Sequence, residues 1–212
     1  MADDESKEEE EEENENQKHE LQKVNFTFKN GDKYDGEVLN KRKHGMGKYT
    51  FKNKDCYEGQ FVEGKFHGHG KYIYSNGDVY EGEFFEGMKS GTGKMTFKGI
   101  GNIYQGEFSD NLADGKGIFT FANGDKYDGE IRENKFNGNG IYTYKNGEKY
   151  DGKFKEDKKH GLGTYYFLDG RIFKGKWEND IIAQDYTNIE ENEENEEEKE
   201  NDEENEEENE DD

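Results

Sequence analysis

Three histidines share one position in a repeated stretch of the chain, and they are the residues best suited to binding a metal. His44, His67 and His160 each stand directly before a Gly-x-Gly pair. In the other copies this position holds Ser90, Asp114 and Asn137. Zinc needs ligand nitrogens at about 2 Å, whereas equivalent positions in adjacent copies are expected two strands, or roughly 10 Å, apart. We therefore expect no metal site and assign the histidines to a polar turn or to bracing a loop.

Two other features could carry chemistry, and neither is accompanied by the groups that it needs. The pairs Gly45/Gly47 and Gly68/Gly70 resemble phosphate-binding loops, but they open a strand and so lack the helix N-terminus that would hold a phosphate. Cys56 is the only cysteine, which excludes an internal disulfide, and it lacks a repeated or adjacent histidine partner. We expect no catalytic residue, no cofactor and no enzymatic activity.

The elements that position these residues are copies of a Tyr-x-Gly-x-Phe frame, in which Val38 or Ile131 can replace the phenylalanine. A looser copy runs from Phe173 to Trp177. The frame begins at Tyr34, Tyr57, Tyr80, Tyr104, Tyr127 and Tyr150. Successive starts are 23 residues apart, with one interval of 24. A fixed period of this length predicts an array of supersecondary units that stack on their neighbours.

Each repeat reads as two short strands joined by turns. In the second repeat we expect strands at 57–61 and 68–74, a loop at 62–67, and a turn at 75–78 whose Asn-Gly pair is a strong hairpin signal. Six full repeats flanked by two half repeats then occupy residues 21–180 and contain fourteen strands. The high glycine and aromatic content indicates a thin sheet. The predicted fold class is all-β, an elongated single-layer antiparallel β-meander.

The register follows from the need to place the aromatic side chains on one face. Tyr80, Gly82 and Phe84 share one face of their strand, and Gly70 and Tyr72 must join them on the same side of the sheet. This requires a turn of odd length, so we expect a three-residue loop with Gly77 left-handed in preference to a two-residue type I′ turn. By the same parity the connection from Phe61 to Gly68 must be even, and we expect a tight turn at 64–65. Residues that tolerate positive φ recur there: Gly64, Gly87, Asn111, Asn134, Asp157 and Asp180.

The two faces differ in chemistry. One alternates acids with lysines or threonines, which suits solvent exposure. The other carries rings around a row of glycines, and these rings either pack on one another or are covered by a partner. The candidate partner-binding rings are Tyr57, Phe61, Tyr72, Tyr80, Phe84, Phe108 and Tyr127. The candidate residues at the open sheet edges are Phe26, Phe28, Phe173 and Trp177.

Both ends of the chain are strongly acidic. Residues 1–20 contain 11 acids and 2 lysines, and residues 190–212 contain 17 acids and 1 lysine, whereas the body between them is nearly neutral. We expect both acidic segments to be disordered. Between them, Ile182, Tyr186 and Ile189 fall at helical spacing after Asp180 and indicate a short helix at 181–189. No apolar run approaches the roughly 20 residues of a membrane span, and no signal peptide is evident, so we expect a cytoplasmic protein.

The segment that begins Tyr57-Glu-Gly-Gln-Phe-Val-Glu-Gly-Lys-Phe-His-Gly-His-Gly-Lys-Tyr and closes with Asn76-Gly77 resembles the MORN repeat. The resemblance extends over about residues 24–178 and implies a twisted single-layer antiparallel sheet that serves as a scaffold. The combination of MORN repeats and acidic ends is similar to the radial spoke head MORN proteins of cilia and flagella.

This resemblance implies a structural adaptor in the ciliary or flagellar axoneme that binds other axonemal or cytoskeletal proteins through its aromatic face and its sheet edges. Pairing of edges could also join two copies into a homodimer. The alternative is a peripheral MORN module associated with membranes or phosphoinositides, which the acidic ends and nearly neutral body disfavour. No nucleic-acid partner is expected.

Overall fold

A computed structural model describes residues 20–187. Apart from Glu20, the acidic segments 1–20 and 190–212 lie outside the described residues, so their expected disorder stays a prediction. Within residues 20–187 all regular structure is strand, in agreement with the predicted all-β meander. There are fifteen strands where the sequence predicted fourteen. No helix capable of crossing a membrane occurs in this part of the chain.

The chain forms two compact units, residues 1–122 and 123–212. The described strands of the first unit are β1 (Gln22–Thr27), β2 (Lys33–Leu39), β3 (Arg42–Thr50), β4 (Cys56–Val62), β5 (Lys65–Ile73), β6 (Val79–Phe85), β7 (Met88–Phe97), β8 (Asn102–Ser109) and β9 (Leu112–Thr120). Those of the second unit are β10 (Lys126–Arg132), β11 (Lys135–Thr143), β12 (Lys149–Lys155), β13 (Lys158–Tyr166), β14 (Ile172–Glu178) and β15 (Ile181–Asp185).

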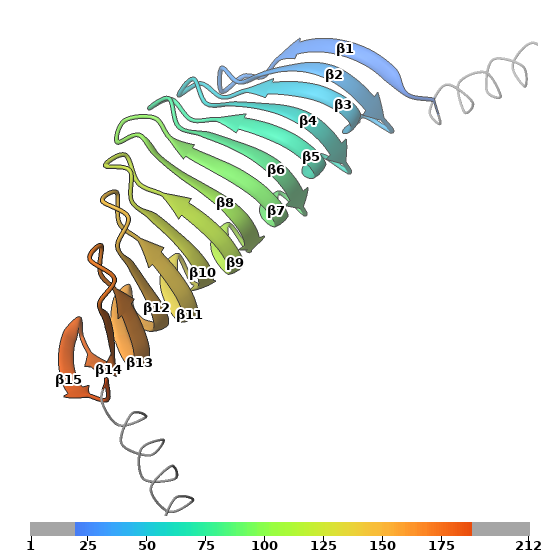
Figure 1. The fold of residues 1–212 in the computed structure, drawn as a ribbon. Coiled ribbons are helices and arrows are strands. Elements are labelled where there is room, and N and C mark those ends of the chain that lie inside the picture. The colour runs from blue at the N-terminus through green and yellow to red at the C-terminus, as the bar shows by residue number, and fades with distance from the viewer. Residues whose placement is uncertain (1–19, 188–212) are drawn as a thin grey trace, which may run out of the picture. The chain divides into compact units, whose positions relative to one another are not determined.

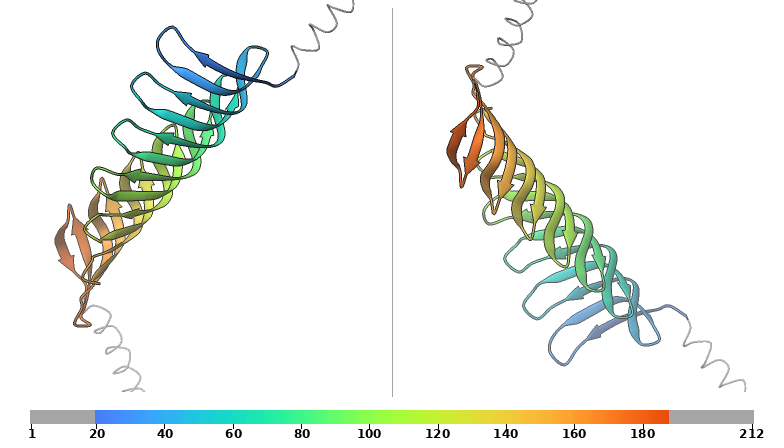
Figure 2. Two further views of the ribbon diagram at one scale, coloured as in Figure 1. Left: turned by 90° about the horizontal axis from the view of Figure 1, so that it is seen from above. Right: turned by 90° about the horizontal axis from the view of Figure 1, so that it is seen from below.

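Within each unit, each strand pairs antiparallel with the next strand along the chain, so the strands lie side by side in sequence order (Figure 1). Two further views show that the described strands of each unit form a single layer (Figure 2). The predicted register is confirmed, because Tyr72 lies opposite Tyr80 and Gly70 lies opposite Gly82. The rings and the glycine row therefore share one face.

The turn between β5 and β6 has the predicted three-residue loop. The Tyr74 N–H donates to the Asp78 carbonyl at 2.9 Å, and the Gly77 N–H donates to the Tyr74 carbonyl at 2.9 Å. Gly77 has φ +91°, a conformation that glycine adopts without the steric cost that a Cβ brings. This loop keeps Tyr72 and Tyr80 on the same face.

The turns at the other ends of the strands contain two residues. Glu63 and Gly64 have φ of 49° and 87°, the pattern of a type I′ turn, whose twist matches that of the flanking strands. The predicted turn at 64–65 was therefore one residue too late, and the positive φ of Glu63 was not anticipated. The Gly64 N–H donates to the Lys43 carbonyl at 2.8 Å, which ties this turn to the preceding repeat.

A β-bulge interrupts the pairing of β2 with β3. Gly36 lies opposite Gly47, but Val38 lies opposite Lys43, so β3 carries two extra residues. Gly45 occupies the bulge with φ +61°. The first glycine of the Gly-x-Gly pair is thus required by this left-handed conformation.

The C-terminal segment corrects two sequence-based predictions. A helix was expected at 181–189, but residues 181–185 form strand β15 instead and residues 186–187 are in neither strand nor helix, while residues 188–189 lie outside the described part. Asn179 and Asp180 both have positive φ, at 51° and 69°, so the chain reverses in a turn and cannot begin a helix at Asp180. Phe173 and Trp177 were expected at a sheet edge, but β14 pairs with both β13 and β15 and is therefore an interior strand.

Candidate functional site

A row of buried tyrosines forms the base of the aromatic face. In the first unit these are Tyr34, Tyr57, Tyr80 and Tyr104, each with at most 2% of its surface exposed. Each hydroxyl donates to the backbone carbonyl three residues further on, as Tyr80 does to Glu83 at 2.8 Å. The rings lie over the glycine row, so the glycines provide the space that the tyrosines fill.

Most of the rings predicted to contact a partner are covered by their neighbours. Six of them are between 0% and 6% exposed: Tyr57, Phe61, Tyr80, Phe84, Phe108 and Tyr127. Edge-to-face contacts, such as Tyr80–Phe84 at 5.1 Å between ring centroids, hold them together. Tyr72 alone is half-buried, and its hydroxyl donates to Asp55 at 2.9 Å. Side chains above this buried layer are the ones that a partner could contact.

The predicted edge residues also differ in accessibility. Phe26 on β1 is 53% exposed, and Phe28, just beyond β1, is half-buried. On β14, Phe173 is half-buried and Trp177 is 6% exposed. Of the four, only Phe26 presents most of its ring at a strand that begins a sheet.

A repeated position that sequence reasoning missed lies just after each two-residue turn, above the tyrosine row. It holds Lys43, Phe66, Lys89, Ala113, Phe136 and Lys159. Phe66 stacks on Tyr57 with 3.9 Å between ring centroids. Because a phenylalanine here lies on the aromatic face, the lysines that replace it in other repeats must lie there too. The period of the repeat, applied to this position, would have revealed them.

Two of these lysines, Lys43 and Lys89, are in the first unit, with their ammonium groups among rings. The Lys43 Nζ is 4.0 Å from the centroid of the Tyr49 ring, and the Lys89 Nζ is 5.5 Å from that of Tyr80. Such positions are favourable for a cation because the face of an aromatic ring is electronegative. The Lys89 Nζ also donates to the Tyr74 hydroxyl at 3.3 Å.

These ammonium groups are partly desolvated and form no ion pair with any described residue. Burial lowers the pKa of both Lys43 and Lys89, although the nearby charge of Asp32 partly opposes this for Lys43. Neither has a carboxylate oxygen within 4.0 Å in residues 20–187. We call Lys43, Lys89 and the rings around them the lysine–aromatic face.

A cavity of about 540 Å³ opens beside Lys43, over β1 to β3. Its apolar walls are formed by Val24, Phe26, Phe28, Tyr34 and Val38. Glu20, Gln22, Asn40, Lys41 and Lys43 supply its polar lining. The cavity therefore combines apolar contact area with a few polar and charged groups, as binding pockets commonly do.

A second missed feature is a ladder of acidic side chains between the three-residue loops. The Asp32 carboxylate accepts hydrogen bonds from the Tyr49 hydroxyl at 2.7 Å and from the Lys52 N–H at 2.8 Å. These bonds lower the pKa of Asp32, the Tyr49 bond most strongly. Asp55 makes the equivalent bonds to Tyr72 and to the Ser75 N–H. The ladder braces successive repeats, so its role is structural.

The histidines lie within strands β3, β5 and β13, so their predicted position in a turn is wrong, whereas the bracing of a loop stays a prediction. The Nδ1 atoms of His44, His67 and His160 are buried and make no hydrogen bond to the described residues. No cluster of three metal-binding side chains occurs in the described residues. Cys56 is half-buried, with its Sγ 4.0 Å from the Thr50 hydroxyl.

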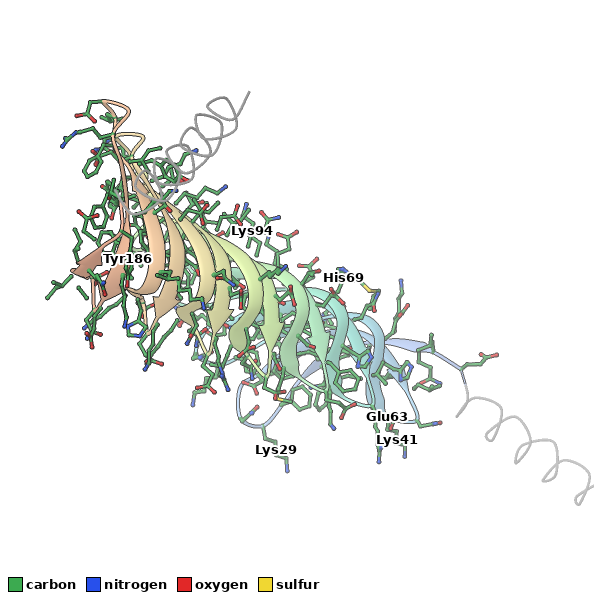
Figure 3. The ribbon with its side chains drawn as sticks, turned by 60° about the horizontal axis from the view of Figure 1, so that its bottom comes forward. Lys29, Lys41, Glu63, His69, Lys94 and Tyr186 are labelled. Atoms are coloured by element: carbon green, nitrogen blue, oxygen red, sulfur yellow. The ribbon has the colours of Figure 1, made fainter. Side chains whose placement is uncertain are left out.

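The opposite face has the predicted cross-strand charges. Lys48 pairs with Glu58 at 3.7 Å, and Lys71 pairs with Glu81 at 3.4 Å. Figure 3 shows Lys94 and His69 projecting away from the strands. Exposed pairs of this kind contribute little to stability, so this face resembles an ordinary solvated surface.

The MORN repeat family model matches residues 34–56, 57–79, 80–99, 104–126, 127–149 and 150–170. No curated protein matches the chain significantly.

Among solved structures, the chain is similar to the TCP domain of SAS-4 (dCPAP) from Drosophila melanogaster in complex with a proline-rich motif of Ana2 (dSTIL). The identity is 15%, the TM-score is 0.43, and the match covers 73% of this chain and 78% of the other. A virginiamycin B lyase from Staphylococcus aureus with quinupristin matches at 15% identity with a TM-score of 0.18, covering 74% of this chain and 60% of the lyase.

Proposed function

Because the chain belongs to the MORN repeat family, we propose that it is a non-enzymatic scaffold that binds other proteins through the lysine–aromatic face of its first unit. The observation that carries the proposal is that this face has no second layer over it among the described residues, although it holds a cavity of about 540 Å³. An apolar, concave surface of this kind is typical of a binding site.

At a finer level we propose that the protein is a radial-spoke-head component of the ciliary or flagellar axoneme, with axonemal proteins as partners. The support for this is the architecture, in which six MORN repeats lie between acidic ends. This assignment also places the protein in the cytoplasm of ciliated cells.

The test uses two phenylalanines of similar exposure that lie on opposite faces. Phe26 is 53% exposed and lines the cavity, whereas Phe85 is 57% exposed and contacts His67 on the charged face. Full-length wild type, F26D and F85D would be expressed in ciliated cells and purified by affinity, and the bound proteins identified. We expect radial-spoke proteins with wild type and F85D, and their loss with F26D.

Equal recovery with both variants would contradict binding at this face, and recovery of no axonemal protein by the wild type would contradict the radial-spoke assignment. Sedimentation with phosphoinositide vesicles tests the membrane alternative. Because the scaffold proposal requires no lipid, strong binding there would favour that alternative instead. Circular dichroism of the purified variants controls for their folding.

A further inference from the structure

The lysine–aromatic face holds two positive charges that form no ion pair among the described residues. Two other cations near turns of the first unit form ion pairs, Lys65 with Glu86 and Arg42 with Glu63. Lys43 and Lys89 are instead half-buried among rings. A carboxylate brought to a partly desolvated ammonium is attracted more strongly than one in open water, so this face selects for an acidic ligand.

The spacing of the two lysines suits an extended chain. Lys43 is on β3 and Lys89 is on β7, so about four strand spacings, or roughly 19 Å, separate them. A run of about six extended residues spans this distance. The occupant is therefore expected to carry several acids in succession.

The chain itself contains such a run close to the cavity. Glu8 to Glu13 are six consecutive glutamates, and residues 1–19 carry 10 acids against 2 lysines. This segment joins the described structure at Glu20, which lines the cavity beside Lys43. The dozen residues from Glu8 to Glu20 reach about 40 Å when extended, whereas β7 lies about 29 Å from β1 at six strand spacings.

We propose that the run Glu8–Glu13 binds in cis to the lysine–aromatic face of the first unit, with its carboxylates against Lys43 and Lys89. This inference rests on the proposed function, since it concerns the same face and adds its regulation. A segment tethered at Glu20 is present at a millimolar effective concentration. A protein partner must therefore displace the segment, and an acidic partner competes for the same two lysines.

The first experiment measures binding of a synthetic peptide of residues 1–19 to the full-length chain by isothermal titration calorimetry. In one variant, Glu8 to Glu13 are all changed to glutamine, which frees the face. We expect this glutamine variant to bind the peptide, and the wild type to bind it about tenfold or more weakly because its own segment competes. A peptide with the same six changes should not bind.

A matched pair of double variants locates the site. In the glutamine background, K43Q/K89Q removes the two cations of the lysine–aromatic face, and K48Q/K71Q removes two cations of the opposite face. We expect K43Q/K89Q to abolish measurable binding and K48Q/K71Q to leave it within about twofold. Equal losses in the two would show a general charge effect and overturn the proposal, as would absence of binding to the glutamine variant.

The second experiment tests the intact wild type with a carbodiimide, which joins a carboxylate directly to an amine. Mass spectrometry should find Glu8–Glu13 linked to Lys43 and Lys89 in preference to Lys48 and Lys71. A mixture of isotopically light and heavy protein distinguishes links within one chain from links between chains. Links chiefly between chains, or chiefly to the opposite face, would overturn binding in cis.

The two proposals fail in different ways. If F26D loses protein partners but the glutamine variant does not bind the peptide, the scaffold function stands and binding of the N-terminal segment is wrong. If the peptide binds as expected but no protein partner depends on Phe26, binding of the N-terminal segment stands and the scaffold function through this face is wrong.

Discussion

The hydroxyl of Tyr80 occupies the space that a side chain at Gly93 would need. A Cβ built on Gly93 would come within 2.5 Å of that hydroxyl oxygen, a distance at which one of the two residues must move. The same hydroxyl donates to the Glu83 carbonyl at 2.8 Å. A ring held in this way above a neighbouring strand makes glycine a packing requirement of the sheet.

We expect Gly93→Ala to lower the free energy of unfolding by about 2 kcal/mol or more, because the added methyl displaces a buried tyrosine. Gly99→Ala is the matched control, since a Cβ there meets nothing within 4 Å and its φ is not positive. Urea denaturation followed by circular dichroism measures both. Similar stability of the two variants would show that the ring moves aside at little cost.

Much of this arrangement could be predicted from the sequence. The period placed tyrosine and glycine on one face, and the parity of the strands required a turn of odd length, for which the three-residue loop at Ser75 to Gly77 was preferred. Both follow from alternation of side chains, which is the strongest local signal in a sheet. The charged face followed from the same alternation.

The features that the sequence did not predict leave the alternation of side chains between the two faces unchanged. The bulge at Gly45 adds two residues to β3, which leaves the parity unchanged. Lys43 and Lys89 look like solvent-exposed residues when each is considered alone, and only comparison with Phe66 places them among rings. For residues 181–185, apolar spacing suggested a helix, but the positive φ at Asp180 continues the hairpin pattern of the preceding repeats.

The lysine positions provide a prediction about stability. We expect Lys89→Phe to stabilise the fold by about 1 kcal/mol, because a phenyl ring there can stack on Tyr80 as Phe66 stacks on Tyr57. The change also removes a half-buried charge. Lys94→Phe, at an exposed position, should give no such gain. Loss of stability in Lys89→Phe would indicate that the cation fits the ring cluster better than a ring does.

Alkaline pH should unfold the sheet through its tyrosines. Burial raises the pKa of Tyr34, Tyr57 and Tyr104 to about 12, whereas an unfolded tyrosine ionises near about pH 10. Their contribution to stability is therefore complete below about pH 10 and is lost as the pH rises through about 12. Tyrosinate absorbance should rise together with loss of the strand signal in circular dichroism. Full ionisation of these residues in a folded chain would contradict their burial.

Acid should destabilise the fold through the aspartate ladder. Here the folded-state pKa is lowered, whereas that of the tyrosines is raised. The pKa of Asp32 is lowered in the folded chain by the Tyr49 hydroxyl and the Lys52 N–H, so its contribution to stability is present above the unfolded pKa of about 3.9 and is lost as the pH falls below it. We expect Asp32→Asn to be less stable than the wild type at pH 7 and to show a smaller further loss on acidification. A melting temperature that falls equally with pH in both proteins would exclude this role for Asp32.

The open edge at β1 leads to a prediction about association. Strand β1 pairs only with β2 among the described strands, and Phe26 beside this edge is 53% exposed. Unpaired strand edges favour pairing with another copy, but residues 1–19, which enter at Glu20, carry a net charge of −8 from 10 acids and 2 lysines. We expect the full-length protein to be monomeric at low ionic strength and to form dimers as salt approaches about 1 M, where the Debye length falls to about 3 Å. Light scattering across a salt series measures the fraction of dimer.

A matched pair of variants tests whether the dimers form at this edge. Phe26→Asp should suppress the dimers and Phe85→Asp should not. A wild type that is monomeric at every salt concentration, or equal behaviour of the two variants, would argue against pairing at this edge.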